Sequence, residues 1–131
     1  MKISIPPGIF EQMITHCRSC LPDEGCCILA GTGTRVARMF PVKNADSSQT
    51  SYLMDPQEQF DVMKSMRASN IEMLAICHSH PESPPYPSEK DIRMAHYAEV
   101  AYVIVSFADN MPIVKAYRIA SGAVLSLAIE R

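Results

Sequence analysis

Two histidines separated by one residue, with an aspartate further along, form the most chemically informative pattern in the sequence. His78 and His80 flank Ser79, and Asp91 follows a proline-rich segment. Imidazole nitrogens and carboxylate oxygens are common zinc ligands, and a set of three leaves the fourth position of a tetrahedral ion open for water. Structural zinc sites normally use four protein ligands, whereas three are typical of hydrolytic sites. The pattern therefore predicts one zinc ion per chain and a hydrolytic reaction.

The segments around these residues indicate how they could meet. Residues 71–77 are short and largely apolar, which predicts a buried strand that ends at His78. Side chains two positions apart share one face of a strand, so His78 and His80 can converge on one ion. Ser88 is a favourable N-cap for a following helix, and it would place Asp91 in the first turn of that helix.

Metal-assisted hydrolysis also needs a group that takes a proton from the attacking water. Glu82 and Glu89 fall in what the sequence predicts to be exposed loop and helix surface. Glu24 is the better candidate, because it directly precedes the apolar run 25–31, which has the length of a strand. A sheet could then carry Glu24 to the metal.

With these residues identified, the chain resembles the JAMM/MPN+ (JAB1/MPN/Mov34-type) zinc metalloprotease family, in its small prokaryotic stand-alone form. The family pattern is an upstream glutamate, then His-Ser/Thr-His, seven residues, Ser, two residues and Asp. Here seven residues separate His80 from Ser88, and two separate Ser88 from Asp91. The residues before His78 depart from many relatives, which have Gly with an aromatic where this chain has 75–77, Ala-Ile-Cys.

The resemblance implies a role for each residue of the pattern. Zinc would be held by His78, His80 and Asp91. Glu24 would act as general acid/base and Ser88 as a donor to the developing oxyanion.

The resemblance also implies the fold and the substrate. The expected fold is a single α/β domain over residues 1–131, an MPN (JAMM) fold with a mixed, curved sheet flanked by helices, cytidine-deaminase-like. The expected partner is a ubiquitin-like β-grasp protein, such as a sulfur carrier or small modifier, with a Gly-Gly C-terminus. A peptidase or isopeptidase would hydrolyse the bond after that tail, which would lie along a sheet edge as an added strand.

Three other readings stay open beside this one. A zinc amidohydrolase of a small substrate or a DNA-repair-associated relative could share the fold, and a non-catalytic ubiquitin-like-binding module would need a dead site.

Metallo-β-lactamase-like patterns require different residues where 81–83 read Pro-Glu-Ser. The zinc deaminase signature, His-x-Glu with a later Pro-Cys-x-x-Cys, does not occur.

The composition of the chain limits the classes of partner that it can bind. A net charge of −2 with 12 basic residues argues against a nucleic-acid surface. No apolar run has the length of a membrane span, and the start, residues 1–7, breaks at prolines before a signal-peptide core could form. Five cysteines, an odd number, fit a reducing compartment. We therefore expect a cytoplasmic protein with no membrane or nucleic-acid partner; the sequence does not indicate its oligomeric state.

The cysteines allow two interpretations. Cys17 and Cys20 form a Cys-x-x-Cys, and with His16, Cys26 and Cys27 nearby they could form a second metal site. The helical stripe of apolar residues over 7–21 favours small core residues instead. Cys77 is expected to point away from the metal, because side chains alternate along a strand.

The remaining pattern predicts the order of elements. Helices are expected at 7–21, 55–68 and 88–98, and a polar loop at 44–51. Strands are expected at 25–31, 34–43, 52–54, 72–79, 100–107, 112–119 and 123–129, the last three as an antiparallel meander.

Overall fold

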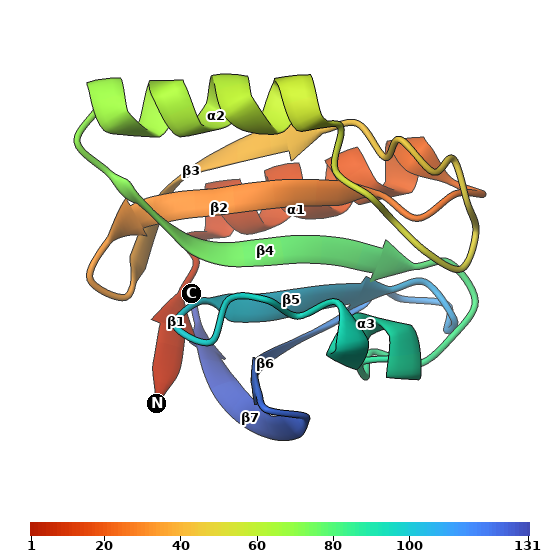
Figure 1. Ribbon diagram of the computed structural model, residues 1–131. Helices are drawn as coiled ribbons and strands as arrows, with labels where there is room; N and C mark the ends of the chain where they lie inside the picture. The colour runs from red at the N-terminus through yellow and green to blue at the C-terminus, as the bar shows by residue number, and fades with distance from the viewer.

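A computed structural model describes all 131 residues as seven strands and three helices (Figure 1). The elements in chain order are β1 (Lys2–Ser4), α1 (Pro7–Cys20), β2 (Cys26–Thr32), β3 (Arg35–Val42), α2 (Pro56–Ala68), β4 (Glu72–His80), α3 (Glu89–Arg93), β5 (Ala101–Ser106), β6 (Ile113–Ala120) and β7 (Ala123–Glu130).

The strands form one sheet that closes on itself in the order β1-β3-β2-β4-β5-β6-β7. Closure depends on β1, which pairs in parallel with β7 through residues 2–4 and with β3 where Ser4 meets Arg35. The expected curved sheet flanked by helices is corrected accordingly: the sheet is mixed, but it is a closed barrel. The sequence analysis missed β1 because its three residues precede two prolines and show no strand-length alternation. The likeness to cytidine deaminases stays a prediction.

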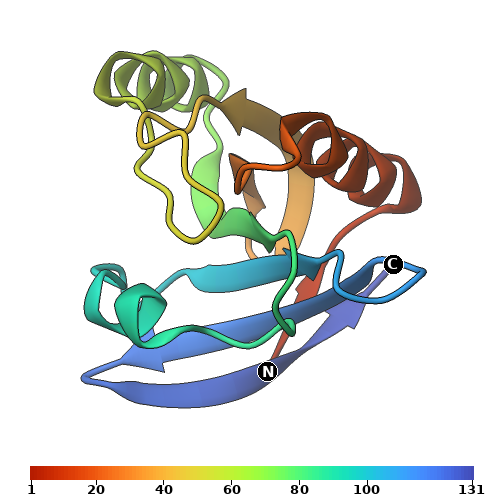
Figure 2. The ribbon, with the colours of Figure 1, turned by 90° about the vertical axis from the view of Figure 1, so that its right-hand side faces the viewer.

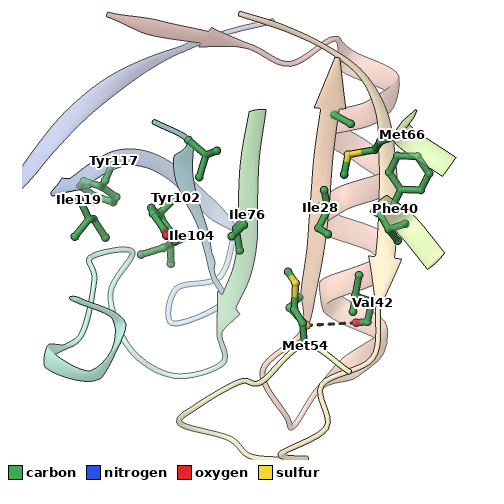
Figure 3. Packing of buried hydrophobic residues seen from close by; sticks show 14 residues of the cluster. Ile28, Phe40, Val42, Met54, Met66, Ile76, Tyr102, Ile104, Tyr117 and Ile119 are labelled. Atoms are coloured by element: carbon green, nitrogen blue, oxygen red, sulfur yellow. Dashed lines mark hydrogen bonds between the residues drawn. The ribbon is translucent and has the colours of Figure 1, made fainter. Parts of the chain in front are cut away.

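Strand alternation gives the β2–β4 part of the sheet two apolar faces, each covered by one long helix (Figure 2). On one face, Ile28 and Ile76 pack in a cluster with Met66 of α2. On the other face, Leu29 packs in a cluster with Met13 of α1. Figure 3 shows the first cluster, in which Ile28 of β2 and Phe40 of β3 lie toward Met66. None of the three helices combines the length and apolar character needed to cross a membrane.

Most predicted elements are present, and the differences have local causes. The meander of β5, β6 and β7 is antiparallel as predicted. Residues 52–54 form only a single bridge, between Met54 and Asn44. The third helix ends at Arg93, earlier than expected, because the following segment turns to pack on the core and the Tyr97 N–H donates to the Tyr102 hydroxyl (3.0 Å).

Candidate metal centre

The structure brings the two histidines and the aspartate together at the carboxyl end of β4. His78 Nε2 lies 3.2 Å from His80 Nε2, and Asp91 Oδ2 lies 3.1 Å from the first nitrogen and 3.0 Å from the second. Both histidines are buried, and they come from the same face of β4, whereas Asp91 comes from the first turn of α3. Cys77, which directly precedes His78, packs with Leu29 in the cluster on the opposite face, as strand alternation predicted.

This geometry fits a tetrahedral zinc ion. Ligand atoms 2.0–2.1 Å from a tetrahedral centre lie roughly 3.3 Å from one another. The three observed separations are close to that value, and the three residues form the one group in the structure that could hold a metal ion. The lone pairs of two imidazole nitrogens and a carboxylate oxygen repel one another at this distance, and a cation between them stabilises the arrangement.

A proline-rich loop fixes the orientation of the His80 ring. Its Nδ1 donates to the Pro84 carbonyl (2.8 Å), so Nε2 is the ring nitrogen that faces Asp91. In the metal-free protein a protonated Nε2 donates to Asp91, and once that proton is lost Nε2 can bind a metal. The loop itself is held from β5 and β6: Ser106 Oγ donates to the Ser83 carbonyl (2.6 Å), and the Tyr117 hydroxyl donates to the Pro85 carbonyl. The loop is therefore a braced wall of the site.

The start of α3 fixes Asp91 through a capping box. The Asp91 N–H donates to Ser88 Oγ (3.0 Å), and the Ser88 N–H donates to Asp91 Oδ2 (2.9 Å). Burial alone would raise the pKa of Asp91, but the hydrogen bonds from His78 and His80 outweigh it and hold that pKa well below its usual range. Asp91 is therefore a carboxylate at any working pH, as a metal ligand must be.

Glu24 lies beside this centre just before β2, as the sequence analysis expected. The residue is 3 % exposed, and its Oε1 is buried without a hydrogen-bond partner. Burial is the main cause that raises the pKa of Glu24 to about 7. The charge of His80 lowers this pKa, and the charge of Asp91 raises it. A carboxyl group with a pKa near neutrality can both accept and release a proton at physiological pH.

Ser79, which the sequence analysis treated only as a spacer, connects the two halves of the site. Its N–H donates to the Gly25 carbonyl (3.0 Å), and its Oγ accepts from the Gly25 N–H (2.8 Å). Gly25 directly follows Glu24, so the strand that carries the histidines also holds the segment that carries the glutamate.

A polar pocket of about 340 Å³ opens onto the centre. It is lined by Glu24, Gln49, Thr50, His80, Pro81, Glu82, Ser83 and Ser88. A larger cavity of about 640 Å³ shares Glu24 but contains none of the three candidate ligands. Of these two, only the smaller pocket contains a candidate ligand, His80, together with Glu24 and Ser88.

The cysteines lie outside this centre. All five are free; Cys17 is buried in the core as the helical stripe predicted, and Cys20 is half-buried. His16 Nε2 lies 2.9 Å from the Cys26 carbonyl oxygen. Sequence reasoning missed two residues near the centre, Tyr52 and Asn44, whose contacts are described below; a polar loop and a short strand gave no signal for either.

Solved structures define the class of fold. A protein from Desulfitobacterium hafniense superposes with a TM-score of 0.88 at 35% identity, covering 98% of this chain and 94% of that one. A JAB1/MPN domain protein from Archaeoglobus fulgidus superposes with a TM-score of 0.63 at 20% identity over 100% of both chains. The fold is therefore that of the MPN proteins.

The sequence comparisons identify the family. Residues 6–120 match the family described as prokaryotic homologs of the JAB domain. The CysO-cysteine peptidase of Mycobacterium tuberculosis is 37% identical over 92% of this chain and 84% of its own length. A probable TtuB-protein conjugate cleaving protease of Thermus thermophilus is 35% identical over 79% of this chain and 70% of its own. The chain belongs to this prokaryotic JAB family, and it is an enzyme of the JAMM peptidase type.

Burial of Glu24 predicts a specific pH dependence of stability in the metal-free protein. Its folded-state pKa of about 7 lies above the ordinary 4.5, so ionisation costs nothing below pH 4.5 and destabilises the fold progressively up to pH 7. Glu24→Gln removes this cost. We expect the variant to gain up to about 3 kcal/mol of unfolding free energy over the parent between pH 5 and pH 8. Urea unfolding with a chelator present measures it; a parent-to-variant difference that does not change with pH would contradict the assignment.

Proposed function

We propose that this chain is a zinc-dependent peptidase or isopeptidase that hydrolyses the bond after the Gly-Gly tail of a ubiquitin-like protein. The observation that carries the proposal is the convergence of His78, His80 and Asp91 within 3.2 Å, beside a buried glutamate whose pKa is near 7. We further propose that residues 1–131 act as one JAMM/MPN+ domain, in the cytoplasm, where thiols such as its five free cysteines stay reduced.

The ligand set would be His78, His80 and Asp91, with one zinc ion per chain. When bound, zinc polarises a carbonyl and lowers the pKa of a water to about 7. Glu24 then accepts the proton of the attacking water and passes it to the leaving amine, which its near-neutral pKa allows. Ser88 Oγ accepts a hydrogen bond from the backbone N–H of Asp91, so the hydroxyl hydrogen of Ser88 is free to donate to the developing oxyanion.

The relatives' names support the kind of substrate. One is a CysO-cysteine peptidase, and another cleaves TtuB-protein conjugates. These names suggest a protein joined to an amino acid or to another protein. We extend this to a β-grasp partner ending in Gly-Gly.

The structure changes how such a tail would bind. The strand that carries the histidines, β4, pairs with β2 on one side and β5 on the other, so it has no free edge for an added strand. The tail would instead enter the 340 Å³ pocket between the 44–55 loop and the braced proline loop. Because Ser106 and Tyr117 hold the proline loop, the pocket cannot widen easily, which favours glycine next to the scissile bond.

Metal analysis tests the ligand set. The purified protein should contain one zinc per chain, and His80→Ala should lose it, because the two remaining ligands cannot hold the ion tightly. His96→Ala, at an exposed histidine outside the centre, is the matched control and should keep the parent's zinc. Two tightly held zincs per chain, or full occupancy in His80→Ala, would overturn the assignment and point to the cysteines.

Two substitutions separate metal binding from proton transfer. Glu24→Gln should keep zinc but lose on the order of 10²-fold or more in rate. Ser88→Ala should lose roughly 10²- to 10³-fold from the missing oxyanion donor, and about 1 kcal/mol of stability from the missing cap. Single-turnover cleavage and thermal unfolding measure the two effects. A Glu24→Gln variant as active as the parent would place the base elsewhere.

The substrate claim is tested with matched tails. Fusions of a ubiquitin-like carrier ending in Gly-Gly should be cleaved, and the same carrier ending in Gly-Val should not, because the side chain would meet the walls of the pocket. Gel-based cleavage with both carriers shown to be folded gives the answer. Equal turnover of both tails, or of an unrelated unfolded peptide, would indicate a general peptidase.

A further inference from the structure

The side chain of Asn44 uses its full hydrogen-bonding capacity at the start of the loop between β3 and α2. Its Nδ2 donates to the carbonyls of Glu24 (3.0 Å) and Ser51 (3.1 Å). Its Oδ1 accepts from the N–H groups of Asp46 (3.0 Å) and Leu53 (3.0 Å). One amide therefore joins the backbone of the candidate base to the loop.

Two of these partners, Ser51 and Leu53, are the immediate neighbours of Tyr52. The Tyr52 ring stacks on the His78 ring with centroids 4.5 Å apart and an interplanar angle of 21°. Figures 1 and 2 both show the 44–55 loop running beside the carboxyl end of β4, where His78 lies. Asn44 thus fixes the backbone on each side of the ring that covers His78.

His78 needs such a support more than His80 does. A metal-binding histidine usually donates its second ring nitrogen to a carbonyl or carboxylate, which fixes its orientation. His80 has this bond to Pro84, whereas the buried Nδ1 of His78 has no partner. The stacked Tyr52 ring is the contact that restricts rotation of the His78 ring in its place.

We propose that Asn44 and Tyr52 form a positioning unit: Tyr52 orients His78 as a metal ligand, and Asn44 holds both Tyr52 and the backbone of Glu24. Neither residue touches the reacting atoms. The unit couples the position of the base to the position of one ligand, so disturbing the loop changes both metal affinity and rate. This inference rests on the proposed function.

The Tyr52 half is tested by comparing Tyr52→Leu with Tyr52→Phe. Leucine removes the stacked ring, and zinc affinity should fall about 10- to 100-fold, the usual effect of losing a supporting contact to a ligand. Phenylalanine keeps the ring and should keep the affinity. Competition with a chromogenic chelator measures affinity without any activity assay. Equal affinity of the Leu and Phe variants would overturn the role of stacking.

The Asn44 half is tested with a control in the same loop. Asn44→Ala should lower zinc affinity and reduce kcat, each by about 10-fold or more, with little change in KM. Asp46→Ala removes only the 3.3 Å contact to Ser51 Oγ within the loop and should leave both unchanged. Should Asn44→Ala not fold, Asn44→Asp keeps the acceptor contacts to Asp46 and Leu53; it should reduce kcat with a smaller loss of zinc affinity.

A double variant tests the connection between the two residues. Because Asn44 acts on His78 only through Tyr52, zinc affinity in Asn44→Ala/Tyr52→Leu should match that of Tyr52→Leu alone. Affinity losses that multiply would show two independent effects and overturn the unit. If the parent protein itself binds no zinc or cleaves nothing, the proposed function fails; if the parent does both and the variants match it, this inference alone fails.

Discussion

The two-residue alternation of β4 is the constraint on which the rest of the site depends. It sends His78 and His80 to one face and Cys77 and Ser79 to the other. One face then supplies two nitrogens 3.2 Å apart, and the other anchors the strand to the core and to Gly25. A slip of one residue in the pairing of β4 with β2 would exchange these roles, so the register between the two strands is also the register of the site.

Groups that could carry the reaction lie in an environment that opposes their charge. Glu24 and His78 are buried, and burial shifts their pKa values toward the neutral form: upward for the acid and downward for the base. Burial would also raise the pKa of Asp91, but hydrogen bonds from His78 and His80 and the charge of His78 lower it and keep Asp91 ionised. Burying these ionisable groups is unfavourable for stability. Neighbouring strands and loops nevertheless hold each group in place from a different direction, which is the arrangement that preorganised catalysis needs.

Much of the centre could be predicted from the sequence because its parts are local. The His78–His80 spacing, the Ser88 cap and the apolar run after Glu24 each lie within one element, where periodicity and capping rules apply. Tyr52 and Asn44 could not be predicted, since their importance comes from contacts with residues brought together only by folding. Closure of the sheet was missed for the same reason: nothing in residues 2–4 identifies partners that lie more than a hundred positions away.

The way the barrel closes bears on the order in which the molecule can be made. β1 is the first strand of the sequence and β7 is the last, so their pairing, with the Lys2–Glu130 contact between them, is the most non-local in the chain. Contacts between residues so far apart in sequence form late, because closing a long loop loses chain entropy before the contacts contribute favourable free energy. On the ribosome, β1 emerges well before its main partner exists. The residues of the metal centre, 24 to 91, are synthesised in between, so a nascent chain could gather them while the ring is still open.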